Sequence, residues 1–106
     1  MLSFDLMTSH EKQIFKQTVE ILSKTLHPSR IVLFGSRAKG KASLSSDFDF
    51  AVECKKRNRS LRERAKDLIE AVSGLYKVDI VYFDELDKKF REIILSTGKV
   101  IYEKRA

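Results

Sequence analysis

Cysteine, proline and tryptophan are scarce in this chain, which has one cysteine, one proline and no tryptophan in 106 residues. The lone Cys54 excludes an internal disulfide and a zinc cluster built from several cysteines. No apolar run approaches the roughly 20 residues that a membrane span requires, so we expect no membrane association. The first residues, Met1 to Asp5, lack the basic and long apolar regions of a signal peptide. We therefore expect a cytoplasmic protein in which Cys54 is a small buried side chain at a strand end.

Acidic residues are in the minority, with 15 Asp and Glu against 21 Lys and Arg and a net charge of +6. This excess permits polyanionic partners such as nucleotides, RNA or an acidic protein surface, but it does not select among them. The densest basic run, Lys55–Arg59 with Arg62 and Arg64 beyond it, has no interleaved aromatic residues to stack on bases. We interpret this run as a solvated loop, with steering of phosphate groups as the alternative, and do not expect direct nucleic-acid binding. The length leaves room for one domain, which we expect to span residues 1–106.

The first half of the chain predicts a long helix followed by two strands. Thr8 and Glu11 are spaced as a capping box, and Pro28 closes the helix that the box opens. The predicted elements are a helix over Thr8–Leu26, a strand over Arg30–Phe34, a short helical piece over Arg37–Lys39 and a strand over Asp47–Glu53. A loop of small polar residues separates the helical piece from the second strand.

The second half predicts two helices that alternate with two strands. Ser60 and Glu63 form a second possible capping box, and Asp84 is the expected N-cap of the last helix. Gly74 and Gly98 are the expected helix ends. The strands are expected over Val78–Phe83 and Lys99–Tyr102. The apolar positions expected to face inward are Leu61, Ala65, Leu68, Ile69 and Val72 in the first helix and Leu86, Phe90, Ile93 and Ile94 in the second.

This order, α-β-α-β-α-β-α-β, predicts an α/β (α+β) fold in which helices flank one small mixed β-sheet. A parallel crossover usually needs a dozen or more residues with a helix. The connection between the first two strands is too short for that. We therefore expect those two strands to be antiparallel.

Three aspartates stand in otherwise apolar strands. Asp47 and Asp49 are two residues apart, so alternation places both on one face of an extended segment, with Phe48 facing the other way. Asp79 interrupts the β-branched run of the third predicted strand, and it is the natural third carboxylate. A strand-edge Asp79 that points to solvent remains the alternative. Carboxylates gathered at one place need bound cations to offset their repulsion, and oxygen ligands suit Mg²⁺ or Mn²⁺.

The turn before these acids is suited to phosphate. Gly35 lets the backbone approach a phosphate closely, and the amide and hydroxyl of Ser36 can donate hydrogen bonds to its oxygens. Together with the aspartates, this turn predicts a site for a nucleoside triphosphate and one or two divalent cations.

At these residues the chain resembles the DNA polymerase β-like nucleotidyltransferase superfamily. The shared signature is a hydrophobic residue, Gly-Gly or Gly-Ser, a spacer of about ten residues and Asp-x-Asp. More closely, the chain resembles the minimal nucleotidyltransferase (MNT) family, the antitoxin half of MNT/HEPN toxin-antitoxin pairs. The segments that carry this likeness, with the small size, are Phe34-Gly35-Ser36-Arg37-Ala38-Lys39-Gly40, Ser46-Asp47-Phe48-Asp49 and Val78-Asp79-Ile80.

The resemblance implies a nucleotidyltransferase fold and transfer of AMP from ATP to a tyrosine of a partner HEPN ribonuclease. It implies that Asp47 and Asp49 hold the metal that bridges the triphosphate, and that Asp79 completes a second metal site and helps to activate the acceptor hydroxyl. The residues that it places around the nucleotide are Gly35, Ser36, Arg37 and Lys39. Lys39 stands where many relatives carry Arg, so a point charge replaces a bidentate guanidinium.

Two other functions remain open on the sequence. One is a non-catalytic antitoxin that binds and occludes its toxin, which the intact aspartates disfavour. The other is an enzyme that modifies a small molecule or an RNA end, for which the basic run Lys55–Arg59 is mild support.

Overall fold

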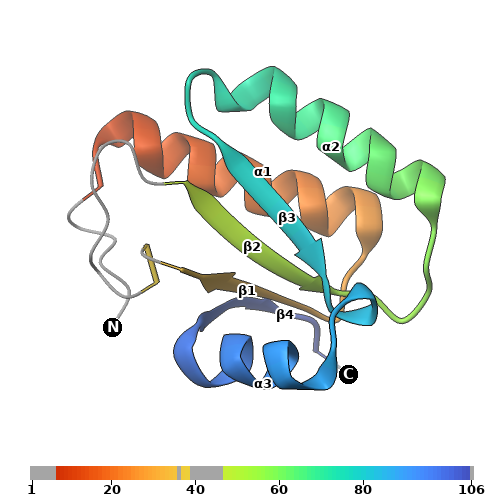
Figure 1. Cartoon of the computed structure of the whole chain (residues 1–106). Helices are drawn as coiled ribbons and strands as arrows, with labels where there is room; N and C mark the ends of the chain where they lie inside the picture. Colours follow the sequence, from red (N-terminus) through yellow and green to blue (C-terminus); the bar gives the residue numbers. More distant parts are fainter. Residues whose placement is uncertain (1–6, 36, 39–46, 106) are drawn as a thin grey trace.

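The computed structural model describes residues 7–35, 37–38 and 47–105. The described residues form three α-helices, one 3₁₀ helix and four strands (Figure 1). In chain order these are α1 (Ser9–Leu26), β1 (Arg30–Phe34), β2 (Phe48–Glu53), α2 (Arg59–Ser73), β3 (Val78–Tyr82), the 3₁₀ helix η2 (Phe83–Glu85), α3 (Lys88–Thr97) and β4 (Lys99–Glu103). Arg37 and Ala38 lie in a turn, and the rest of the predicted short helical piece falls outside the described residues.

The strands form one mixed sheet in the order β3-β2-β1-β4. β1 pairs antiparallel with both β2 and β4, whereas β2 and β3 run parallel. The antiparallel pairing of β1 with β2 confirms the prediction from their short connection. The parallel pair is joined through α2, which supplies the helical crossover that parallel strands require.

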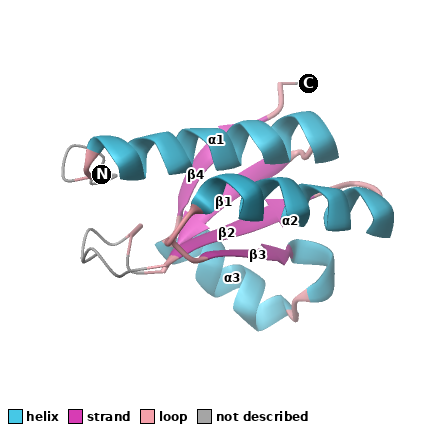
Figure 2. Cartoon of the chain, turned by 90° about the horizontal axis from the view of Figure 1, so that it is seen from above, coloured by secondary structure: helices cyan, strands magenta, loops and turns pink. Residues whose placement is uncertain are grey.

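Helices cover the two faces of the sheet unequally. α1 and α2 pack together on one face, and α3 lies on the other (Figure 2). The larger core, under α1 and α2, includes Ile14, Phe15, Leu22, Ile31, Leu33, Phe48, Phe50, Val52, Ala65 and Ile69. The smaller core, under α3, is built from Val32, Ala51, Phe83 and Ile94. In the described residues, no helix combines the length and the apolar character needed to cross a bilayer.

The start of α1 is as predicted. The Glu11 amide donates to Thr8 Oγ1 at 3.1 Å, and the Thr8 amide donates to Glu11 Oε1 at 2.8 Å, so the capping box is complete. Because two otherwise unpaired amides are satisfied by side chains, the first turn of the helix is fixed. His27 ends the helix in a left-handed conformation with φ of +47°.

The predicted start of α2 is wrong. Asn58 caps the helix, with its side-chain oxygen accepting from the Leu61 amide at 3.0 Å, and Ser60 lies inside the first turn. Asn and Ser are comparable N-cap residues, so the local sequence does not decide between Asn58 and Ser60. Leu68, predicted to be buried, is 38% exposed. The buried residues of α2 are Arg62, Ala65, Ile69 and Ser73, and Gly74 ends the helix as expected.

The predicted start of α3 is also wrong. Asp84 belongs to η2, and α3 is capped by Asp87, which accepts from the Phe90 amide at 2.8 Å. Ile94 is buried as predicted, but Phe90 and Ile93 are 40% and 49% exposed. α3 is the only described helix on its face of the sheet, so one narrow stripe of it is covered and the neighbouring apolar positions stay open. Gly98 ends α3, as expected.

Candidate active site

Asp49 of β2 and Asp79 of β3 are paired in register across two parallel strands. Partners in register point to the same face of a sheet, so the two carboxylates lie side by side. Phe48 and Phe50, on either side of Asp49 in the chain, point to the opposite face and are fully buried. The sequence predicted the convergence of these two aspartates, and the register now places them next to each other.

The carboxylate of Asp49 is electrostatically strained. Its pKa is raised, first by burial and then by the negative charges of Asp79 and Asp47 and by a hydrogen bond with Asp79. Lys77 opposes this shift, with its Nζ 3.9 Å from Asp79 Oδ2. Asp47, which immediately precedes β2, therefore belongs to the same electrostatic cluster. We call Asp47, Asp49 and Asp79 the aspartate cluster.

Gly35 brings the end of β1 against the aspartate cluster. Phe34 is the register partner of Asp49, so the turn that follows β1 begins beside the Asp49 carboxylate. Gly35 has φ of +77°, and a Cβ built on it would lie 2.5 Å from Asp49 Oδ2. Glycine is thus required both by its backbone conformation and by the close approach to a carboxylate. The other two predicted nucleotide contacts at this turn, Ser36 and Lys39, lie outside the described residues.

Arg37 is directed into the protein. Its guanidinium is 2.9 Å from Glu11 Oε2, and both side chains are almost completely buried. It also stacks 3.9 Å from the centroid of the Phe48 ring. Burial alone would raise the pKa of Glu11, but hydrogen bonds from Thr8 and Arg37 outweigh it, and the pKa is lowered. In this arrangement the Arg37 side chain ties the turn after β1 to the start of α1.

The donor set of the aspartate cluster fits a hard divalent cation, because carboxylate oxygens that repel one another are stabilised when a cation binds between them. The raised pKa of Asp49 is the observation that supports this fit. In the described part of the chain, no three Asp, Glu, His or Cys side chains are already gathered as a complete ligand set. Asp49 and Asp79 are the adjoining pair, and the charge of Asp47 acts on Asp49.

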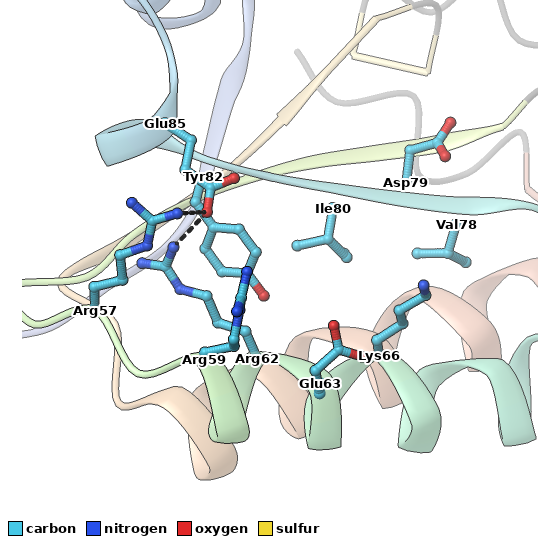
Figure 3. Close-up of a pocket in the computed structure, with 10 residues that line it drawn as sticks. All are labelled: Arg57, Arg59, Arg62, Glu63, Lys66, Val78, Asp79, Ile80, Tyr82 and Glu85. Atoms are coloured by element: carbon cyan, nitrogen blue, oxygen red, sulfur yellow. Dashed lines mark hydrogen bonds and ion pairs between the residues drawn. The ribbon is translucent and has the colours of Figure 1, made fainter.

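A groove of about 490 Å³ lies between α2 and β3 and has Asp79 at one end (Figure 3). The cations that line it are Arg57, Arg59, Arg62 and Lys66. We call it the α2–β3 groove. It places Asp79 of the aspartate cluster on the same surface as part of the basic run that the sequence analysis interpreted as a solvated loop.

Arg62 at the far end of this groove is buried, although the sequence suggested a solvated cation. It forms ion pairs with Asp84 at 3.1 Å and Glu85 at 2.9 Å and lies 3.9 Å from the centre of the Tyr82 ring. Burial raises the pKa of Tyr82 to about 12, so its hydroxyl stays protonated at neutral pH. The buried stripe of α2 repeats at 62, 65, 69 and 73, and this helical spacing was the available signal for the burial of Arg62.

Cys54 follows the end of β2 and packs against the larger core. Burial raises the pKa of its thiol above the ordinary value, so the reactive thiolate form is disfavoured at neutral pH. The prediction of a buried Cys54 at a strand end holds in part, because the side chain packs against the larger core but is only partly buried.

The fold, the paired aspartates and the glycine turn define a nucleotidyltransferase type of site. A family model described as polymerase beta, nucleotidyltransferase, matches residues 16–106. The chain belongs to this polymerase beta nucleotidyltransferase family.

Two curated relatives are more specific. The chain is 32% identical over 96 residues to Protein adenylyltransferase MntA of Aphanizomenon flos-aquae (strain 2012/KM1/D3), which covers 81% of this chain and 64% of that protein. It is 34% identical over 85 residues to a Haemophilus influenzae protein named Probable protein adenylyltransferase MntA, covering 79% of this chain and 75% of that protein. The chain therefore spans just under two thirds of the first relative and three quarters of the second.

Solved structures confirm the fold. A crystal structure of a toxin-antitoxin with AMP-PNP has a TM-score of 0.69 at 22% identity, covering 85% of this chain and 73% of that one. A complex of a tri-AMPylated Shewanella oneidensis HEPN toxin with its MNT antitoxin has a TM-score of 0.64 at 19% identity, covering 90% and 73%. At these identities the likeness establishes the architecture.

Proposed function

We propose that this protein is a metal-dependent nucleotidyltransferase that transfers AMP from ATP to a hydroxyl group of a partner protein. The observation that carries the proposal is the in-register pairing of Asp49 with Asp79, beside a glycine turn that only a side-chain-free residue can make. Like charges placed together without a structural need are costly, so their convergence indicates a site built for a cation and a polyanion.

Asp47, Asp49 and Asp79 would hold one or two Mg²⁺ ions, with Mn²⁺ as the alternative. When bound, the metal neutralises charge on the triphosphate and on the leaving pyrophosphate. We propose that Gly35 lets the backbone approach the phosphates and that Ser36 and Lys39 contact them. For Arg37 we propose a positioning task, because its guanidinium pairs with the buried Glu11.

Asp79 is the residue of the cluster that also lines the α2–β3 groove, so it lies where an acceptor can arrive. We propose that Asp79 takes part in accepting the proton of the acceptor hydroxyl. The acceptor oxygen then forms a bond to the α-phosphorus, the bond between the α-phosphorus and the bridging oxygen breaks, and pyrophosphate leaves. The chain mainly supplies position and charge for this step.

The proposed acceptor is a tyrosine of a HEPN toxin. Its support is the resemblance of the motif to MNT antitoxins, the adenylyltransferase names of the two curated relatives, and the AMPylated HEPN toxin held by a structural neighbour. Since ATP and Mg²⁺ are needed, we also propose that the protein acts in the cytoplasm.

The test is incubation of the purified chain with labelled ATP, Mg²⁺ and the product of the neighbouring gene, which we expect to be a HEPN protein, followed by mass analysis of that product. We expect an AMP adduct with wild type and a loss of at least about a hundredfold in rate with Asp47→Asn or Asp79→Asn. Asp67→Asn is the matched control, because Asp67 is an exposed carboxylate on α2 outside the cluster. Tight binding of the HEPN protein without an adduct would instead identify a non-catalytic antitoxin. Labelling of an RNA end or a small molecule in place of the HEPN protein would identify an enzyme that modifies that RNA or small molecule.

A further inference from the structure

The α2–β3 groove runs along an open edge of the sheet. In the described part of the chain, β3 pairs with β2 on one side and has no strand on its other side. The edge of a sheet presents backbone amides and carbonyls that can pair with an added extended segment. The groove therefore has the form of a site for an extended polypeptide.

The two faces of strand β3 present different side chains. Val78 and Ile80 point toward α2, whereas Asp79 between them points to the opposite side of β3 (Figure 3). Both apolar side chains are partly exposed. An extended segment lying beside β3 would meet apolar and basic side chains on the α2 side and the aspartate cluster on the other side.

The charges of the groove favour an acidic occupant. Arg57 and Arg62 share Glu85, at 3.1 and 2.9 Å, while Arg59 and Lys66 have no ion pair with any other described residue. Apart from Asp79, the carboxylates that line the groove are Glu63 and Glu85. With Asp79 counted, four cations stand against three acids in the lining of the groove. The two cations without an ion pair in the described residues, Arg59 and Lys66, make the α2 side positive and open to a partner.

We propose that the α2–β3 groove is the docking site for the acceptor protein, and that it binds an extended, acidic segment that carries the acceptor hydroxyl. This inference rests on the proposed function, because the hydroxyl must come to the aspartate cluster. Asp79 stands on the strand that forms one wall of the groove, so a segment paired with β3 can direct one side chain to the aspartate cluster and the neighbouring side chains to α2.

The geometry also specifies where the acidic residues of the acceptor stand. Successive side chains of an extended segment alternate between faces, so the hydroxyl residue faces the aspartate cluster and its immediate neighbours face α2. From Asp79 to Tyr82 the groove follows β3 over three residue-to-residue steps, or about 10 Å at the rise of a strand. Acidic residues one or three positions from the hydroxyl residue therefore reach the cations of the α2 side.

The first experiment measures AMP transfer to the HEPN protein by a double variant, Arg59→Glu with Lys66→Glu. We expect the KM for the HEPN protein to rise about tenfold while the KM for ATP stays unchanged. The matched control is Arg64→Glu with Lys89→Glu, which changes net charge equally at exposed positions outside the groove. Transfer with a wild-type KM for the HEPN protein in the Arg59/Lys66 variant would overturn the docking site and leave the proposed function standing.

The second experiment measures binding without chemistry, by fluorescence anisotropy. Two labelled peptides of identical composition each contain one tyrosine and two glutamates, placed at odd offsets from the tyrosine in one peptide and at even offsets in the other. We expect the odd-offset peptide to bind more tightly, with an affinity that falls as salt rises and falls again in the Arg59/Lys66 variant. If this peptide binds although no AMP transfer is detected, the docking site stands and the proposed function fails. Equal binding of both peptides, or their displacement by single-stranded RNA, would refute the proposed occupant.

Discussion

Replacing Asp49 with Asn should make the protein more stable while abolishing nucleotidyl transfer. Asn is nearly isosteric with Asp, so the substitution preserves the shape of the side chain and removes its charge. The folded state raises the pKa of Asp49 through burial and through the charges of Asp79 and Asp47, so the ionised carboxylate is disfavoured where it stands. Removing that charge removes the free-energy cost of holding an ionised carboxylate at this position in the folded state.

The size of the gain follows from the neighbouring charges. Two unit charges about 5 Å apart repel by about 3 kcal/mol at an effective dielectric constant of about 20. Asp49 is partly exposed and Lys77 lies nearby, so solvent and this cation reduce the value. We expect about 1 kcal/mol of added stability at pH 7, or about 5 °C in Tm for a domain of this size.

The direction of the pKa shift of Asp49 determines how the stability of the wild type changes with pH. The pKa of Asp49 in the folded state is raised above its ordinary value of 3.8, so between these two pKa values the folded state binds more protons than the unfolded state. Stability of the wild type therefore falls as pH rises through this interval. The advantage of Asp49→Asn should be greatest at neutral pH and should disappear near the ordinary pKa of aspartate.

Thermal unfolding of wild type, Asp49→Asn and the control Asp67→Asn, each measured at several pH values, tests this reasoning. Added Mg²⁺ should stabilise the wild type more than Asp49→Asn, because a bound cation offsets the same repulsion. A lower Tm for Asp49→Asn at pH 7 without Mg²⁺ would show that Asp49 contributes to stability, and the account of the cluster as a strained cation site would be refuted.

Two further predictions concern the turn after β1. Gly35→Ala should reduce AMP transfer far more than Gly74→Ala, because both glycines have positive φ but only at Gly35 does the added Cβ meet Asp49; equal effects on transfer would contradict this. Glu11→Gln should cost about 3 kcal/mol in urea unfolding at pH 7, because it removes the charge that faces the buried Arg37. The pKa of Glu11 is lowered from 4.5, so its contribution is complete above that value and is lost as pH falls through the folded pKa; a pH-independent effect of Glu11→Gln would argue against the ion pair.

Much of the fold follows from local signals that act over a few residues. The Thr8–Glu11 capping box and the strand Arg30–Phe34 are found where the sequence predicts them. The caps of α2 and α3 were misplaced because several good capping residues stand close together, and the sequence does not show which turn packs first. Phe90 and Ile93 were expected inside, yet the area of sheet available to α3 decides their exposure, and that area is a tertiary property.

The sequence predicted which three aspartates form the cluster, but it did not predict the register in which β2 and β3 pair. Alternation puts Asp47 and Asp49 on one face, and the α2 crossover implies that β3 runs parallel to β2. That Asp79 stands opposite Asp49, rather than one residue away, depends on how α2 packs on the sheet. The ion pairs of Arg62 were similarly hidden, because its partners Asp84 and Glu85 follow more than twenty residues later.

Strand β2 has two separate tasks, and alternation is what allows it to perform both. Phe48 and Phe50 fill the core under α1 and α2, while Asp49 faces the other way and meets Asp79. A slip of one residue in the pairing of β2 would bury carboxylates among apolar side chains and expose both rings, which costs far more than the repulsion within the cluster. The stacking of Arg37 on Phe48 adds to this constraint, because it fixes the turn after β1 to the buried face of the same strand. The hydrophobic face of β2 therefore holds the strained carboxylates in register, and the stability lost at the cluster is offset by packing on the opposite face.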